Sequence, residues 1–377
     1  MWWRIALIAA VLAAGGARAA EDIRIGAFLS ATGVMSPMGE PERKALDMLV
    51  ERLNAEGGVD GRQVRLVSYD DGSDPERAAM LVKRLIDNDR VDIILGGSGT
   101  PTSMAVLATI ERAEIPYISM GGGIGIVEPV RKWVFKVPQT DRMAAGTVFD
   151  DMRHRGLTRI ALLSENVGFG KSGHDQCLLL APQHGIEVIA DETYAPKDAD
   201  VTPQLTRIRA AAGVQALFIF GTGTGPAVAT RNLRQLGLAV PVYQSHGVAS
   251  NEFLRLTGAA ADGIRLPAGA LAVADQLAAT DPQKPVVAAF KAAYEARWHS
   301  EVDMLAGHAY DAFSIAVDAI RRAGSTDKAG LRDAIERTRG YVGTAGIVTM
   351  SASDHLGLGP DAFHLVEIRN REWVLVN

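Results

Sequence analysis

The sequence predicts an α/β fold of two doubly wound parallel-sheet lobes, and three observations support this class. Short apolar runs typical of buried parallel strands alternate with segments of helical periodicity. The alternation runs from residue 23 to residue 155 and starts again at residue 159, which indicates two units of similar size. Glycine-rich turns follow several strands, at the sheet edge where open α/β sheets bind ligands.

The first unit begins with alternating apolar residues at 23–29, which predict a strand. A helix is expected over residues 42–55, where apolar residues recur at helical spacing before a Gly-Gly pair. The further elements expected in this unit are strands at 64–69, 91–95, 115–119 and 134–137, and helices at 75–87 and after Pro101. A helix at 141–155 is expected to follow it.

The second unit repeats this order of strands and helices. Strands are expected at 159–164, 187–194, 216–220 and 240–244, and helices at 170–184, 203–212 and 225–236. After residue 266 the pattern predicts helices at 285–298, 305–323 and 328–337, then strands at 347–350, 363–368 and 373–376. These late pieces do not form a third sheet, so we expect them to pack on the two lobes.

Three crossovers between the lobes are expected, at residues 136–140, 264–269 and 348–354. They make a three-strand hinge. The resulting division assigns 21–138 and 268–348 to lobe 1, and 139–267 and 349–377 to lobe 2.

The first 20 residues are typical of a secretory signal peptide. Arg4 precedes a short apolar run, and Ala17-Arg18-Ala19 fits a cleavage site. The run is too short to span a membrane, which takes about 20 residues. Removal of these residues takes away two arginines and no acidic residue, so the net charge changes from −5 to −7. We expect an exported soluble protein; an ordinary N-terminal helix is the alternative.

Composition excludes some classes of function. The net charge of −5 over 377 residues argues against nucleic-acid binding, which requires a basic surface. Cys177 is the one cysteine and lies in an apolar run, so a buried structural thiol is expected rather than a nucleophile. The eight histidines show no metal-binding spacing, and we expect no metal and no other cofactor.

The glycine-rich turn at residues 96–100 is the strongest candidate for a binding site. Gly96, Gly97 and Gly99 let a ligand approach the backbone, and Pro101 suits the first turn of a helix. Free amides at a helix start favour an anion. A plain strand-to-helix connection that binds nothing is the alternative.

Three motifs of enzymes are incomplete. The turn at 221–226 begins like a dinucleotide fingerprint, but Pro226 stands where its last glycine belongs. Residues 168–172 resemble the end of a phosphate-binding loop, but Glu165 replaces its first glycine. Ser98 lacks the closing glycine of a nucleophile elbow. We expect no catalytic residues; a hydrolase that uses Ser98 with His246 or His308 as base is an alternative.

The order of these pieces resembles the periplasmic receptors of branched-chain amino-acid ABC transporters, the type I periplasmic binding proteins. The resemblance runs from about residue 22 to the C-terminus. It is carried by residues 25–33 (IGAFLSATG), 54–61 (NAEGGVDG), 69–75 (YDDGSDP), 114–119 (EIPYIS), 168–170 (GFG) and 245–249 (SHGVA).

The resemblance implies a ligand held between two lobes that close about a hinge, in a periplasmic monomer that serves an inner-membrane permease and performs no catalysis. Loops after two lobe 1 strands would bind the ligand carboxylate, and Phe169 would stack on the ligand. The expected ligand-binding residues are Met38, Ser98, Gly99, Thr100, Gly121, Gly122, Gly123, Phe169, Thr222, His246 and Gly247.

One departure from the family bears on the ligand. Amino-acid receptors of this family carry an acidic residue where this chain has His246, and a neutral imidazole cannot pair with an ammonium group. Relatives that resemble this chain at 38–41 (MGEP) and 245–249 take up aromatic carboxylates. We therefore expect an aromatic acid or a 2-keto acid. The alternatives are a branched-chain amino acid, a sensory role in place of transport, and a solvated His246 without function.

Overall fold

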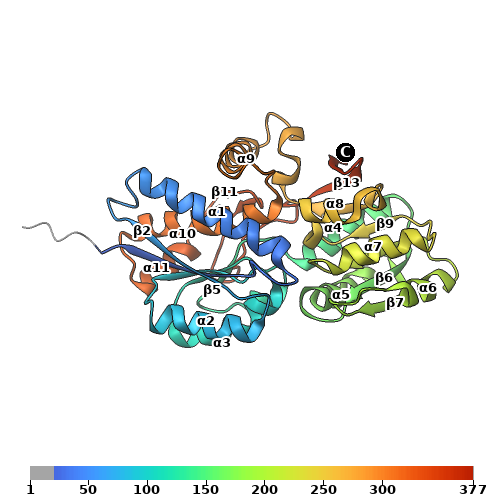
Figure 1. Cartoon of the computed structure of the whole chain (residues 1–377), viewed down its shortest axis with the longest axis horizontal. Coiled ribbons are helices and arrows are strands. Elements are labelled where there is room, and N and C mark those ends of the chain that lie inside the picture. Colours follow the sequence, from blue (N-terminus) through green and yellow to red (C-terminus); the bar gives the residue numbers. More distant parts are fainter. Residues whose placement is uncertain (1–20, 377) are drawn as a thin grey trace, which may run out of the picture.

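The computed structural model describes residues 21–376, and the expected signal peptide at 1–20 lies outside the described residues. Figure 1 shows two lobes side by side, each a sheet covered by helices. This is the two-lobed α/β architecture that the sequence predicts. Among the described residues, no helix is long and apolar enough to cross a membrane.

The first lobe contains a parallel sheet with helices on both faces. Its strands are β1 (Ile23–Leu29), β2 (Val64–Asp70), β3 (Ile93–Gly96), β4 (Tyr117–Ser119) and β5 (Val134–Lys136), and its first helices are α1 (Ser36–Ala55), α2 (Pro75–Asp87) and α3 (Thr100–Ala113). The strand order is β2-β1-β3-β4-β5. All four residues of β3 are buried, which explains the unbroken apolar run.

The second lobe contains a larger, mixed sheet. Its strands are β6 (Arg159–Glu165), β7 (Glu187–Tyr194), β8 (Ala216–Phe220), β9 (Val242–Gln244), β10 (Arg265–Ala268), β13 (His364–Arg369) and β14 (Glu372–Leu375). The order is β14-β13-β10-β9-β8-β6-β7, and the two C-terminal strands pair antiparallel. Its helices are α4 (Asp141–His154), α5 (Gly168–Leu180), α6 (Thr202–Ala210), α7 (Gly225–Gln235) and α8 (Asn251–Thr257).

Most of the C-terminal part packs on the first lobe. Its helices are α9 (Lys284–Trp298), α10 (Met304–Ala323) and α11 (Lys328–Glu336). Helix α10 packs along α1, so this pair covers one face of the first sheet while α2 and α3 cover the other (Figure 1). The expected strand at 347–350 forms instead a small ribbon of β11 (Tyr341–Val342) and β12 (Ile347–Val348), outside both lobe sheets.

Short 3-10 helices complete the described secondary structure, most of them in connections that the sequence patterns leave unassigned. They are η1 (Ile124–Ile126), η2 (Ala181–His184), η3 (His246–Val248), η4 (Gly258–Ala261) and η5 (Ala270–Gln276).

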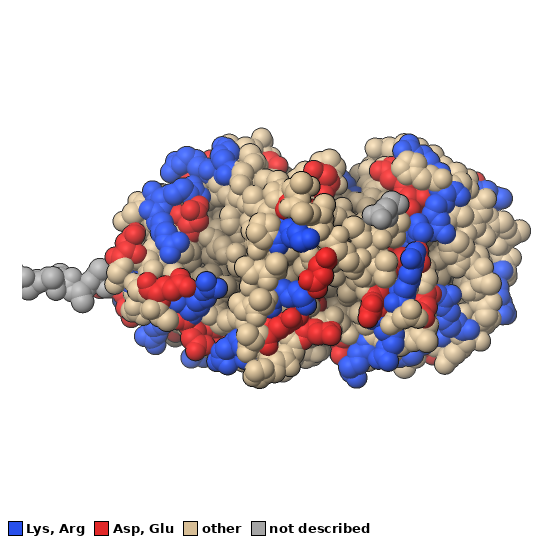
Figure 2. Space-filling view, turned by 90° about the horizontal axis from the view of Figure 1, so that it is seen from above, with Lys and Arg blue, Asp and Glu red and all other residues tan. Residues whose placement is uncertain are grey.

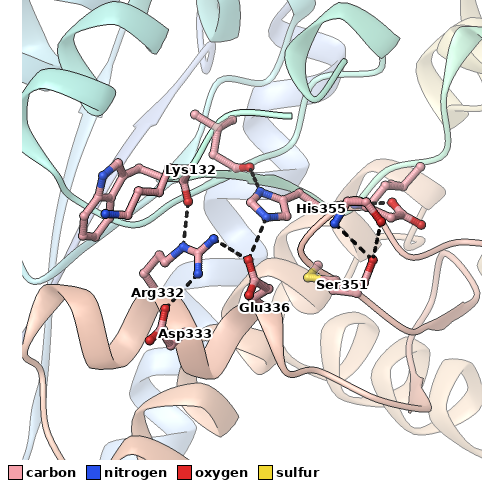
Figure 3. A network of polar contacts seen from close by, with 12 residues as sticks. Lys132, Arg332, Asp333, Glu336, Ser351 and His355 are labelled. Carbon is pink, nitrogen blue, oxygen red and sulfur yellow. Dashed lines mark hydrogen bonds and ion pairs between the residues drawn. The ribbon is translucent and has the colours of Figure 1, made fainter. Parts of the chain in front are cut away.

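The segment after β12 stays with the first lobe. The ring of His355 stacks on Phe135 of β5 at 4.2 Å, and its Nδ1 lies 2.8 Å from the carbonyl oxygen of Val134. Its Nε2 lies 3.3 Å from a carboxylate oxygen of Glu336, which also pairs with Arg332 (Figure 3). The third crossover therefore follows these contacts and lies later than the boundary expected after residue 348. The sequence of the segment between β12 and β13 has no periodicity that would reveal its contacts with the first lobe.

Candidate functional site

A cavity lies between the two lobes, next to the hinge. It is narrow, with room for about one water molecule. A ligand of several carbon atoms therefore requires the lobes to separate and close around it. The wall consists of Met35, Met38, Gly99, Thr100, Met120, Gly122, Pro138, Phe169, Thr222, His246, Gly247, Leu305 and His308.

The lobes touch each other directly around this cavity. The Oγ1 atom of Thr222 in lobe 2 lies 3.1 Å from Sδ of Met38 in lobe 1. A Cβ atom at Gly122 would lie 2.7 Å from Cε2 of Phe169 and 3.3 Å from Nε2 of His246, both in lobe 2. Gly122 is thus a point where only a residue without a side chain permits this closed arrangement.

The lobe 1 wall is built at the start of α3. The backbone at Gly96 has φ +129°, and a Cβ there would lie 2.2 Å from the carbonyl oxygen of Phe28, so glycine is required for the turn. Gly99 is the N-cap of α3. Among the described residues, the amides of Thr100 and Gly122 donate no hydrogen bond. Free amides at a helix start favour an anion, and anion binding at this turn stays a prediction.

Three expected residues support this wall from behind instead of lining it. The Ser98 hydroxyl donates to the Glu42 carboxyl group and accepts the amide of Ser30 at 3.1 Å. The amide of Gly121 donates to the Ser119 hydroxyl. The amide of Gly123 donates to Oγ1 of Thr100 at 3.0 Å. These three residues do not belong to the described cavity wall, and the Ser98 hydroxyl and the amides of Gly121 and Gly123 are bonded within lobe 1, so a direct contact of theirs with the ligand stays a prediction.

The same contacts weigh against the Ser98 hydrolase alternative. Ser98 is paired with the buried Glu42 carboxyl group and not with an imidazole, and burial raises the pKa of that carboxyl group well above its ordinary value. No hydrogen bond among the described residues joins Ser98 to His246 or His308.

The lobe 2 wall is aromatic. Phe169, at the start of α5, meets His246 edge-on, with ring centres 5.2 Å apart, and packs against Phe220 at 5.1 Å. Thr222 donates from its hydroxyl to the carbonyl oxygen of Gly247 at 3.0 Å. Phe169, Thr222, His246 and Gly247 all lie in the wall, where the sequence places them.

Two buried imidazoles are the wall's ionisable groups. His246 is 2% exposed and His308 is 3% exposed, so His246 is not a solvated loop residue. Nδ1 of His246 and both ring nitrogens of His308 have no hydrogen-bond partner in the described chain. Burial and the nearby charge of Lys136 lower the pKa of both rings, that of His308 to about 3, and keep them neutral.

A buried lysine lies at the hinge beside these rings. Nζ of Lys136 donates to the carbonyl oxygens of Pro138 and, at 3.1 Å, Gln139. Within residues 21–376 it forms no ion pair, and burial lowers its pKa to about 7. On the outer face shown in Figure 2 basic and acidic residues are interspersed, whereas no Asp, Glu, Lys or Arg belongs to the described cavity wall.

The cleft continues outward into a wider, mostly apolar space. This outer space shares Met35, Phe169 and Thr222 with the inner cavity. Glu165 borders it, accepts the amide of Thr222 at 3.3 Å, and has a pKa that burial raises to about 8. An acidic group therefore lies near the cavity, although outside its inner wall.

Sequence reasoning missed five wall residues: Met35, Met120, Pro138, Leu305 and His308. Pro138 lies in a crossover that the sequence predicts, which is a signal that was available. Leu305 and His308 are three residues apart on α10 and share a face, but no local pattern shows that this face meets the other lobe.

Known proteins share this architecture. A family profile described as "Periplasmic binding protein" matches residues 22–371. The leucine-, isoleucine-, valine-, threonine- and alanine-binding protein of Pseudomonas aeruginosa is 27% identical over 344 residues, which cover 87% of each chain.

Solved structures agree with these relatives. An extracellular ligand-binding receptor from Rhodopseudomonas palustris HaA2 has a TM-score of 0.88 and 29% identity, covering 94% of this chain and 99% of its own. The branched-chain amino acid transporter substrate binding protein LivJ from Streptococcus pneumoniae, in complex with isoleucine, has a TM-score of 0.82 at 22% identity and covers 94% of this chain and 100% of its own, which supports the fold alone. With the profile spanning nearly the whole chain, this protein belongs to the periplasmic binding protein family, in the branch of the leucine/isoleucine/valine-binding type.

Proposed function

We propose that this chain is the periplasmic receptor of an ABC importer and that it binds a small carboxylate without an ammonium group, an aromatic acid or a 2-keto acid. The observation that carries the ligand class is the composition of the inner wall. It offers free amides of Thr100 and Gly122 to an anion, but no carboxylate to a cation.

The energetics of burial favour this ligand class. An ammonium group taken into the cavity without a partner costs several kcal/mol, since it loses its hydration. The neutral rings of His246 and His308 can each supply a donor or an acceptor, but no negative charge. Lys136, close to both rings, disfavours a second positive charge further.

The apolar part of the wall fits the body of such a ligand. Phe169 offers an aromatic surface from lobe 2, and Met35, Met38, Met120 and Leu305 supply apolar surface from lobe 1. Methionine side chains adapt to irregular shapes and contact aromatic rings favourably. Contacts from both lobes stabilise the closed form, which is the form that we propose the permease accepts. A sensory role is the alternative to transport. Permease and ATPase genes next to the gene of this chain would favour the importer over a sensory partner.

A branched-chain amino acid is the second candidate. The name of the relative from Pseudomonas aeruginosa favours it. In this chain its ammonium group would have to reach Glu165, in the outer part of the cleft next to Thr222. Ionisation of Glu165 would then have to accompany binding, since burial raises its pKa to about 8.

A thermal-shift screen of the ligand-free protein tests the proposal. Ligands that bind only the folded state raise Tm by mass action. The panel contains benzoate, phenylpyruvate and 4-methyl-2-oxopentanoate together with leucine, isoleucine and valine. We expect the acids to raise Tm more than the amino acids at equal concentration. A larger shift with leucine, isoleucine or valine would support the second candidate instead.

A further inference from the structure

His308 is a buried polar side chain without a partner. It lies on α10, is 3% exposed, and lines the cavity next to Leu305. Both of its ring nitrogens lack a hydrogen bond within the described chain. Buried polar groups in native proteins are nearly always paired, so an imidazole in this position calls for an explanation. Nothing in its own lobe satisfies it.

His308 and the amide of Thr100 reach the same cavity from two helices that cover different faces of the first sheet. Thr100 begins α3, which covers one face of the first sheet, and His308 belongs to α10, which covers the other face (Figure 1). A ligand whose carboxylate lies at the start of α3 can therefore present a second, neighbouring polar atom to His308. The site has two separate polar positions within one apolar wall.

The surroundings of His308 determine which chemical group suits it. Burial keeps the ring neutral, so it presents one N–H donor and one acceptor nitrogen. The charge of Lys136 is close enough to act on the ring and disfavours a cationic group there. An electron-rich oxygen that accepts the N–H bond meets both conditions. A purely apolar group would leave the ring unpaired.

We propose that His308 is a specificity-determining residue that donates a hydrogen bond to a second oxygen of the ligand, a keto or hydroxyl oxygen beside the carboxylate. The inference rests on the proposed function and deepens it: the ligand is a 2-oxo or 2-hydroxy acid with an apolar body rather than a simple carboxylic acid.

The test compares two acids that differ in one oxygen. The affinities of 4-methyl-2-oxopentanoate and 4-methylpentanoate are measured by calorimetry for the wild type, His308→Leu and His308→Gln, with leucine as a third ligand. His184→Leu, which removes an imidazole of η2 that does not belong to the cavity wall, is the matched control. Thermal unfolding without ligand checks the fold of each variant. We expect His308→Leu to keep its Tm, because His308 loses no bond within the protein.

We expect the wild type to bind the oxo acid about tenfold more tightly than 4-methylpentanoate. His308→Leu should remove most of this preference by weakening the oxo acid alone. His308→Gln, which keeps an N–H donor, should retain part of it, and His184→Leu should retain all of it.

Equal affinity of the two acids for the wild type would overturn the role of His308, as would an equal loss for both acids in His308→Leu. Tighter binding of leucine than of either acid would instead overturn the proposed function, and the ratio between the two acids would still report on His308. Absence of binding for both acids at millimolar concentration would overturn both.

Discussion

Replacement of Gly122 by alanine should hold the lobes apart. The new methyl carbon would lie 2.7 Å and 3.1 Å from two ring carbons of Phe169 and 3.3 Å from Nε2 of His246. These rings cannot retreat easily, because Phe169 packs against Phe220 and His246 against Phe363 at 4.9 Å. The contacts of the new methyl carbon at Gly122 with Phe169 and His246 cross from lobe 1 to lobe 2. We therefore expect the strain to be relieved by opening of the hinge and not by unfolding of a lobe.

Overpacking by one methyl group costs about 1–3 kcal/mol, which corresponds to a loss of roughly 5–150-fold in affinity for a ligand that needs the closed form. Calorimetry with the tightest ligand of the screen measures this loss, and small-angle scattering of the ligand-free protein should show a larger radius of gyration.

Gly125→Ala is the matched control, since a Cβ at this position in the same loop meets nothing within 4 Å. Its affinity and radius of gyration should equal those of the wild type. Equal affinities of Gly122→Ala and Gly125→Ala for the ligand would refute the reasoning, because the contact between Gly122 and lobe 2 would then be irrelevant to binding.

Three further substitutions test the charges and the wall. Burial lowers the pKa of Lys136 from 10.5 to about 7, so between these pH values the folded protein binds fewer protons than the unfolded chain. Lys136 therefore destabilises the folded protein most at low pH. Lys136→Met should raise Tm more at pH 6 than at pH 9.5, and equal increases at the two pH values would contradict this. Burial raises the pKa of Glu165 from 4.5 to about 8, so the stability of the folded protein falls as pH rises between these two values. Glu165→Gln should therefore raise Tm more at pH 9 than at pH 5. A larger increase at pH 5 would disprove this expectation. Ser98→Ala leaves a buried carboxyl group and an amide without a partner and should lower stability by about 1–3 kcal/mol in urea unfolding. The ligand affinity of folded Ser98→Ala should stay near that of the wild type. A large loss of affinity would indicate that Ser98 contacts the ligand directly.

The fold follows from features that are local in the sequence. Strand β3 is a continuous apolar run because both of its faces are buried, and α3 begins where Pro101 and the preceding glycines indicate. Two sequence predictions differ from the structure: the lobe boundary expected after residue 348, and the strand expected at 347–350, which forms only as β12 (Ile347–Val348). The segment around His355 is tied to β5 by a ring stack and hydrogen bonds between residues far apart in sequence, which no periodicity reports.

The site shows the same division between local and tertiary information. Gly99, Thr100, Phe169 and His246 lie in the cavity wall, where sequence motifs place them. The direction of the Ser98 hydroxyl is set by Glu42 on α1, 56 residues away in sequence, so the local turn could not reveal it.

The role of a helix face also depends on its tertiary neighbours. Leu305 and His308 lie on a helix that reaches the cleft only because α10 packs along α1. Local motifs thus identify loops of the cavity wall, whereas the rest of that wall depends on how distant elements pack.

The most direct test of the account isolates the ammonium group. Leucine and 4-methyl-2-oxopentanoate share a carboxylate and an apolar body and differ only at C2. Competitive calorimetric titration of the ligand-free wild type gives the ratio of their dissociation constants. We expect the oxo acid to bind at least about tenfold more tightly, since the described cavity wall holds His246 and His308 and no carboxylate. Tighter binding of leucine would contradict the account and make the chain a branched-chain amino-acid receptor.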